Sequence, residues 1–217
     1  MQRLVLQFLL AIVVGLCTSG AFALSPAPAE AKILVHGDSL SAAYNMPVTA
    51  SWVALLGQKA AQQSPPWTVV NSSVSGETTS GGLARLPALL THHQPQIVLL
   101  ELGANDGLRG LDPAAMQANL AAMIELSQAA GAQVLLIGIQ LPPNFGQLYN
   151  AEFERVFKAL AETYQLPLIP SLLKPVELER EAFQPDQLHP RAEVQERLMV
   201  PVWDALQALL LKHSATG

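Results

Sequence analysis

Short apolar runs alternate with longer amphipathic segments along most of this chain. Five runs are predicted to be strands, at residues 32–36, 67–71, 97–102, 134–139 and 166–169. The third of them is almost wholly apolar, as expected of a parallel strand that is buried on both faces. Helices are predicted over residues 51–62, 83–92 and 113–130, from Asn150 onward, and over 191–211. Because strand and helix alternate, the pattern predicts an α/β fold with a mostly parallel sheet and helices on both faces.

Capping residues sharpen several of these helix boundaries. Asp112 precedes Pro113, which gives an N-cap with proline at the first helical position. Gly131 supplies a stop signal at the other end of that helix. Asn150 is predicted to cap the next helix, since acidic residues follow it where they suit the helix dipole.

The N-terminal segment is predicted to be a targeting signal rather than part of the fold. Residues 4–16 form an apolar run that is too short to span a bilayer comfortably, and Ala21-Phe22-Ala23 resembles a cleavage site. We therefore expect a signal peptide at residues 1–23 and a single domain at residues 24–217. That domain would be periplasmic or secreted, with no stable membrane insertion after cleavage. An uncleaved N-terminal anchor is the alternative.

Composition limits the chemistry and the partners of the predicted mature chain. Cys17 is the one cysteine of the sequence, so signal removal would exclude disulfides, thiolate nucleophiles and cysteine-bound zinc. Half of the 217 residues are hydrophobic, 13% are charged and the formal net charge is −5. The basic residues are scattered, which gives no reason to expect a nucleic-acid partner.

Three polar loops each follow a predicted strand directly, at residues 37–41, 73–80 and 103–110. In a doubly wound sheet, the carboxyl ends of the strands lie along one edge, and ligand sites form there. We therefore expect these three loops to come together. This expectation follows from the order of the elements alone.

Ser39 is the candidate nucleophile of the first loop. A nucleophilic serine needs a tight strand-to-helix turn that exposes Oγ and leaves backbone N–H groups free for an anion. Gly37 and Asp38 directly before Ser39 are consistent with such a turn, although an ordinary helix cap would explain the same residues. The chain has no G-x-S-x-G, which counts against an α/β-hydrolase elbow.

His189 is the histidine best placed to act as a base. Asp186 precedes it by three residues on a loop before the last helix, a spacing that lets the carboxylate reach Nδ1 and leaves Nε2 for a serine. The alternative is an Asp N-cap beside a surface histidine. The other histidines lie in a strand, at a helix end or in the C-terminal tail: His36, His92, His93 and His213.

An oxyanion needs several donors directed at one point. Gly76 offers a backbone N–H with no side chain in the way, and Asn105 offers a neutral side-chain N–H. A flexible turn at Gly76 and an Asn-driven turn at Asn105 are the plain alternatives. The nearby carboxylates are expected to hold loops by accepting backbone N–H groups, and no metal site is expected from them. They are Asp38, Glu101 and Asp106.

Taken together, these residues resemble the SGNH (GDSL) hydrolase family, and within it the bacterial periplasmic thioesterase I/lysophospholipase/arylesterase group. The four blocks of that family occur in order, as Gly37-Asp38-Ser39-Leu40-Ser41, Gly76 in Ser-Gly-Glu-Thr, Gly103-Ala104-Asn105-Asp106 and Asp186-Gln187-Leu188-His189-Pro190. The likeness runs from about Lys32 to the last helix. Gln187 and Arg191 stand where the family usually has glycine and asparagine, and Ala104 replaces a glycine.

The resemblance implies a flavodoxin-like three-layer α/β/α sandwich with a five-stranded parallel sheet. It also implies Ser39 as nucleophile, His189 as base and Asp186 as the group that orients it. The oxyanion hole would combine the N–H groups of Ser39 and Gly76 with the side chain of Asn105. Since the substituted positions do no chemistry in the family, we expect them to affect only the geometry of their loops.

The function expected from these features is a serine esterase or thioesterase that acts on aryl esters, acyl-CoA or lysophospholipids through an acyl-enzyme on Ser39. No cofactor and no metal are expected, the partner is a small-molecule substrate, and a monomer is expected. The apolar loop at residues 140–149 either supports an acyl chain or packs on the core. The alternatives are a carbohydrate O-deacetylase of the same superfamily and a non-catalytic exported binding module.

Overall fold

A five-stranded parallel sheet forms the centre of the molecule. The computed structural model describes residues 31–216, so the predicted signal peptide at residues 1–23 lies outside the described residues. The strands are β1 (Ala31–Gly37), β2 (Trp67–Asn71), β3 (Ile97–Glu101), β4 (Gln133–Ile137) and β5 (Leu168–Ile169). Their order is β2-β1-β3-β4-β5, and every pairing is parallel. This is the flavodoxin-like order, so the predicted fold class is confirmed.

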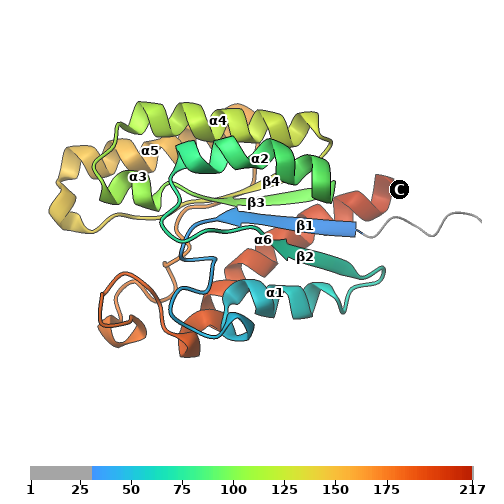
Figure 1. The fold of residues 1–217 in the computed structure, drawn as a ribbon, viewed down its shortest axis with the longest axis horizontal. Coiled ribbons are helices and arrows are strands. Elements are labelled where there is room, and N and C mark those ends of the chain that lie inside the picture. Colours follow the sequence, from blue (N-terminus) through green and yellow to red (C-terminus); the bar gives the residue numbers. More distant parts are fainter. Residues whose placement is uncertain (1–30, 217) are drawn as a thin grey trace, which may run out of the picture.

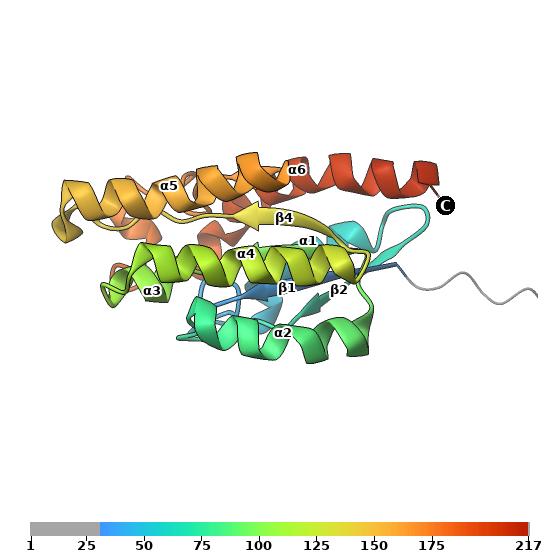
Figure 2. The same ribbon diagram turned by 90° about the horizontal axis from the view of Figure 1, so that it is seen from above.

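Helices cover both faces of the sheet (Figure 1). On one face lie α2 (Thr79–His93), α4 (Pro113–Ala129) and α5 (Gln147–Tyr164), which are seen side by side in Figure 2. The opposite face is covered by α1 (Trp52–Ala60) and α6 (Gln195–Thr216), which contact one another. The apolar strand β3 is buried along its whole length between these layers, as its sequence predicts. No helix in residues 31–216 is long and apolar enough to cross a membrane.

Local sequence signals account for where several helices begin and end. The Ser51 hydroxyl accepts a hydrogen bond from the Ala54 N–H at the start of α1. Asp112 does the same for the Ala114 N–H at the start of α4, directly before Pro113. After α4, Gly131 adopts a φ of 83°, a left-handed conformation that ends the helix. The cap and the stop predicted for α4 are therefore confirmed.

The helix predicted at residues 83–92 begins earlier, at Thr79, because Thr78 caps it and two glycines continue it. One of them, Gly82, lies where a Cβ atom would come within 2.4 Å of Leu102 Cδ1. Glycine therefore lets this helix pack closely on the sheet, so the Gly-rich sequence here marks a close contact rather than a loop.

Three further boundaries differ from the expectation. The loop expected at residues 103–110 contains a short helix, α3 (Ala104–Leu108). Helix α5 begins at Gln147, and the Asn150 side chain donates to the Pro142 carbonyl instead of capping a helix. The last helix follows a 3-10 turn at residues 192–194 and starts at Gln195. Local propensity alone does not predict these helix boundaries, because tertiary contacts and short turns also determine where a helix begins.

Candidate active site

The loops predicted to meet do so at the carboxyl edge of the sheet, where the strand order changes direction between β1 and β3. The turn that carries Ser39 follows β1, and Asn105 lies in the first turn of α3 after β3. Such a switch point is where open α/β sheets bind ligands, since the connections leave the sheet in opposite directions there. The expectation drawn from element order is confirmed.

The turn around Ser39 is held by close contacts to the end of β3. Gly37 pairs with Glu101 in the sheet, and a Cβ atom on Gly37 would come within 2.9 Å of the Glu101 carbonyl oxygen. The Asp38 carbonyl accepts the N–H groups of Ser41 and Ala42 at 3.2 and 2.9 Å, which closes a tight turn over Ser39. The sequence Gly-Asp-Ser thus places the serine hydroxyl directly beyond the strand.

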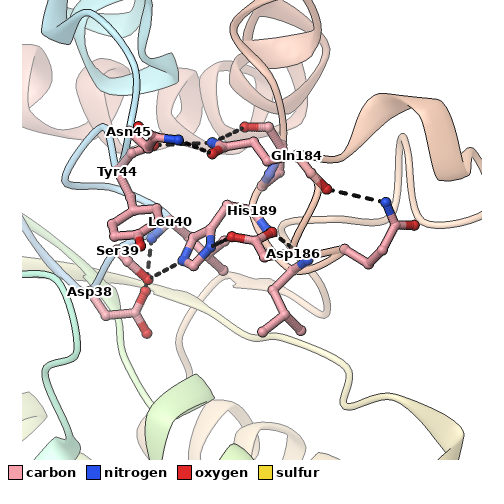
Figure 3. Close-up of polar contacts among 11 residues, drawn as sticks. Asp38, Ser39, Leu40, Tyr44, Asn45, Gln184, Asp186 and His189 are labelled. Carbon is pink, nitrogen blue, oxygen red and sulfur yellow. Dashed lines mark hydrogen bonds and ion pairs between the residues drawn. The ribbon is translucent and has the colours of Figure 1, made fainter.

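A continuous line of hydrogen bonds joins Asp186, His189 and Ser39 (Figure 3). His189 Nδ1 lies 2.8 Å from Asp186 Oδ2, and His189 Nε2 lies 2.8 Å from Ser39 Oγ. With a proton on Nδ1, the imidazole donates to the carboxylate and accepts the serine O–H at Nε2. The sequence spacing of three residues therefore brings the carboxylate to the ring nitrogen that was predicted.

Backbone contacts fix the Asp186 carboxylate beneath the imidazole. Its Oδ1 accepts the N–H groups of Leu188 and His189, each at 3.0 Å. Partial burial would raise the pKa of Asp186, but these bonds and the His189 side chain together hold it below its ordinary value. The carboxylate therefore stays ionised at neutral pH, where it can stabilise a positive charge on the imidazole.

Asn105 is tied to the serine turn through the buried carboxylate of Asp38. Asn105 Nδ2 donates to Asp38 Oδ2 at 3.2 Å, while Asp38 Oδ1 accepts the Leu40 N–H at 3.0 Å. An amide nitrogen carries two hydrogens, so one can point at Asp38 while the other serves a ligand. The predicted role of Asp38 in holding loops is thus confirmed.

Gly76 reaches the site from the loop after β2, where its φ of 79° is one that residues with a side chain rarely adopt. The Arg109 guanidinium donates to the Gly76 carbonyl at 2.9 Å, which fastens this exposed loop to the end of α3. Ser39, Gly76 and Asn105 all line one cavity together with His189. The sequence signalled Gly76 but gave no sign of the Arg109 contact, because the two residues are 33 positions apart.

Two further carboxylates lie under the site. Glu101 is buried and accepts the Ser41 hydroxyl at 2.6 Å. Asp106 accepts both the N–H and the hydroxyl of Thr79, at 2.8 and 2.6 Å, and so joins α3 to the start of α2. Both residues hold loops, as expected of them. Among the residues that the structure describes, no three His, Cys, Asp or Glu side chains form a cluster able to hold a metal ion.

Burial sets the protonation of the carboxylates next to the serine turn. It raises the pKa of Asp38 to about 6, while the bonds from Leu40 and Asn105 oppose the rise. Burial also raises the pKa of Glu101 well above its ordinary value, and the nearby Asp38 charge adds to the effect. We infer that Glu101 keeps its proton where an exposed glutamate would be ionised.

The unusual Gln187 fits the loop despite lacking the freedom of the glycine usual in the family. Its φ is 58°, in the left-handed region that glycine adopts without penalty. Its side chain donates to the Gln184 carbonyl at 3.1 Å and accepts from Arg180 Nε at 3.1 Å. These contacts hold the strained conformation, so the loop keeps its course to His189.

Comparison with known proteins places the chain in a family. Residues 35–197 match the GDSL-like Lipase/Acylhydrolase family. Esterase TesA of Pseudomonas aeruginosa is 46% identical over 90% of this chain and 99% of its own length. The arylesterase of Vibrio mimicus is 45% identical over 86% and 91%, and the thioesterase 1/protease 1/lysophospholipase L1 of Escherichia coli is 44% identical over 78% and 80%.

Solved structures agree with this assignment. The crystal structure of TesA matches with a TM-score of 0.79 at 47% identity, over 82% of this chain and 99% of that one. The esterase EstA from Pseudoalteromonas sp., inhibited by monoethylphosphonate, also gives 0.79, at 38% identity over 83% and 99%. Together, the fold and the relatives identify the chain as a serine hydrolase that acts on esters. The chain belongs to the GDSL-like lipase/acylhydrolase family.

The raised pKa of Glu101 makes a prediction about stability. The folded state binds this proton more tightly than the unfolded state does. The proton on Glu101 therefore stabilises the folded state. This stabilisation is complete below the ordinary glutamate pKa of 4.5, and it is lost as the pH rises through the raised pKa of Glu101 in the folded protein. Glu101→Gln keeps an acceptor for Ser41 without the titration. We therefore expect its free energy of unfolding in urea to fall less than that of the wild type between about pH 5 and about pH 8.

The exposed Glu152→Gln on α5 is the matched control, and it should leave the pH dependence of the wild type unchanged. Parallel pH curves for the wild type and Glu101→Gln would contradict the assignment of a retained proton to Glu101.

Proposed function

We propose that this enzyme cleaves carboxylic esters and acyl thioesters, among them aryl esters, acyl-CoA and lysophospholipids, through an acyl-enzyme on Ser39. The observation that carries the proposal is the hydrogen-bonded line from Asp186 through His189 to Ser39, with 2.8 Å at each link. Nucleophile, base and orienting carboxylate in this arrangement are the requirements of serine acyl transfer, whatever the fold that supplies them.

In the first half of the reaction, Ser39 Oγ attacks the carbonyl carbon as its proton passes to His189 Nε2. The carbonyl oxygen becomes an anion, for which the Ser39 and Gly76 N–H groups and the Asn105 amide are the proposed donors. The tetrahedral intermediate then collapses, and the alcohol or thiol leaves with the proton from His189. Asp186 stabilises the imidazolium between these two proton transfers.

Water completes the cycle by the same route. His189 Nε2 takes a proton from the water as its oxygen attacks the acyl carbon, and the same donors receive the second oxyanion. Collapse returns the proton to Ser39 Oγ and releases the carboxylic acid. Oxyesters and thioesters pass through the same oxyanion, so this site serves both.

The cavity beside Ser39 supports acyl groups larger than acetyl as substrates. Its volume is about 710 Å³, within the usual range for small-molecule sites. Apolar side chains make up much of its lining, among them Leu108, Ile139, Leu141, Pro142, Leu173 and Phe183. The loop at residues 140–149 contributes Leu141 and Pro142 to this lining, while Leu141, Phe145 and Tyr149 also pack on the core. We therefore expect the loop to support the acyl chain from a position that the core holds.

The cellular setting is part of the proposal. We expect residues 1–23 to act as a cleaved signal peptide, and residues 24–217 to work as one domain in the periplasm or outside the cell. The apolar run and the small-residue site before Leu24 support this. We expect the mature enzyme to be a monomer that needs no cofactor, since the proposed steps use only its own side chains.

Covalent labelling tests the proposed nucleophile. A fluorophosphonate should modify Ser39, because its phosphorus accepts attack from the activated hydroxyl and the adduct mimics the tetrahedral intermediate. Peptide mass spectrometry of the labelled protein reads this out, with Ser39→Ala as the unlabelled variant. The exposed Ser80→Ala on α2 is the control and should label like the wild type. A wild-type protein that takes up no label would point to a binding module.

Asn105→Ala tests the proposed oxyanion donor. Loss of one such donor should lower kcat by about 10²–10³ while KM changes little, because the donor acts mainly on charge that develops in the transition state. Steady-state hydrolysis of a p-nitrophenyl ester measures both constants. Gln128→Ala, an amide loss on the exposed face of α4, should keep the wild-type kcat. Full kcat in Asn105→Ala would remove Asn105 from the oxyanion hole.

A substrate profile tests the acyl group and the leaving group together. Hydrolysis of p-nitrophenyl esters of increasing chain length should continue beyond acetate, because the apolar part of the cavity accepts additional methylene groups. An acyl-CoA of the preferred length should also be cleaved, as followed by thiol release. Activity confined to acetyl esters of glycans would instead identify a carbohydrate deacetylase.

A further inference from the structure

The imidazole of His189 has a neighbour that the sequence did not indicate. The ring of Tyr44 lies against it, with ring centroids 4.2 Å apart and an angle of 30° between the planes (Figure 3). Tyr44 comes from the loop after β1, five residues beyond Ser39, and it is 42% exposed. The base is thus bordered by an aromatic ring as well as by Asp186 and Ser39.

The backbone around Tyr44 is held in a conformation that the chain does not adopt freely. Ala43 and Asn45 on either side have φ values of 60° and 53°, left-handed values that cost energy for residues with a side chain. Such a conformation persists where surrounding contacts determine it. The position of this tyrosine is therefore built by the fold.

Gln184 provides those contacts and links Tyr44 to the loop of the base. Its side chain donates to the Tyr44 carbonyl at 3.1 Å and accepts from Asn45 Nδ2 at 3.1 Å. The same amide donates to the Pro190 carbonyl at 3.3 Å, and the Gln184 backbone N–H donates to the His189 carbonyl at 2.8 Å. One buried residue thus fixes the Tyr44 backbone and the His189 backbone relative to each other.

We propose that Tyr44 is a positioning residue of the reaction, whose ring stabilises the protonated form of His189. The inference rests on the proposed function, because only acyl transfer through His189 requires its imidazolium. An aromatic face carries partial negative charge and attracts a cation within about 6 Å of the ring centre. The positive charge that appears on His189 when Ser39 gives up its proton lies within that range. The neutral imidazole gains far less, so the ring favours the transition state over the ground state.

Two carboxylates also act on the charge of His189. Asp186 contacts it from the same loop, and Asp38 acts on it from the turn after β1. The pKa of Asp38 is raised to about 6, so its titration contributes to any pH profile measured in the acid range. A variant of Tyr44 leaves both carboxylates in place. The difference between that variant and the wild type therefore isolates the ring.

The experiment compares Tyr44→Leu and Tyr44→Phe with the wild type in the pH dependence of kcat/KM for a p-nitrophenyl ester. Without the ring, protonating the base costs more, so the acid limb of the Tyr44→Leu profile should move about 0.5 pH unit toward lower pH. Its kcat on the pH plateau should fall about threefold, because the imidazolium of the transition state loses the same stabilisation. Tyr44→Phe keeps the ring face, so its acid limb should stay with that of the wild type.

Tyr164→Leu, at the far end of α5, is the matched control for loss of a tyrosine ring and should leave the profile unshifted. Tyr44 also lines the cavity, so an acid limb that does not move in Tyr44→Leu, with KM alone changed, would limit Tyr44 to contact with the substrate and overturn the inference. An equal shift in Tyr44→Phe would overturn it too, since the ring would then not be the cause. Failure of the proposed function is distinguishable, because the wild type would then hydrolyse no ester.

Discussion

The arrangement of the site depends on the close approach of β1 and β3 where these two strands end. Gly37 lies opposite Glu101 with no room for a side chain, and the chain turns directly after this contact. Glu101 accepts the Ser41 hydroxyl and Asp38 accepts the Asn105 amide, so one small buried region connects the turn around Ser39 with the start of α3. The switch in strand order places this region beneath an open edge, where a substrate can reach it.

The polar groups of the site divide into a buried set and an accessible set. The buried set consists of Asp38, Glu101 and Ser41, which are satisfied by one another and by backbone N–H groups. Burying a carboxylate costs free energy unless it is hydrogen-bonded or protonated. Asp38 and Glu101 are both hydrogen-bonded, and burial raises the pKa of each, which favours the protonated form. The accessible set is Asp186 and His189, on a loop with greater exposure. A rigid buried layer beneath the more accessible Asp186 and His189 suits the proposed reaction, in which Ser39 must keep its position while substrates enter and leave.

The His189 loop is fixed from two directions. Asp186 holds the imidazole at Nδ1 from within the loop, and Tyr44 lies along its face from the loop after β1. Gln184 joins the two loops through its side-chain amide, although they are about 140 residues apart in the sequence. Because Ser39 and Tyr44 share one short segment after β1, a displacement of that segment would affect both Ser39 and His189, the proposed partners of the proton transfer.

The sequence predicted the parts of this protein that depend on local order. The alternation of buried strands and amphipathic helices predicted the α/β class, and the spacing of Asp186 and His189 predicted the bond between them, because a spacing of three lets the carboxylate reach the imidazole within one turn. Ser39, Gly76 and Asn105 could be proposed because each lies in a loop that directly follows a strand, and in a parallel sheet those strand ends share an edge. Helix ends were predicted where caps were strong, as at Asp112 and Gly131.

Other features were decided only by the tertiary structure. The predicted helix at residues 83–92 leaves out Gly82, since glycine disfavours helices, yet the close packing of α2 on Leu102 requires glycine at this position of the helix. The contacts of Arg109 with Gly76 and of Tyr44 with His189 join distant segments, and neither residue type carries a local signal for such a partner. Local propensity and spacing act over a few residues, whereas these contacts depend on how helices and loops settle around the finished sheet. The order of strands and helices along the sequence thus determined which groups meet at the strand ends, and only the packed fold decided which side chains hold those groups in place.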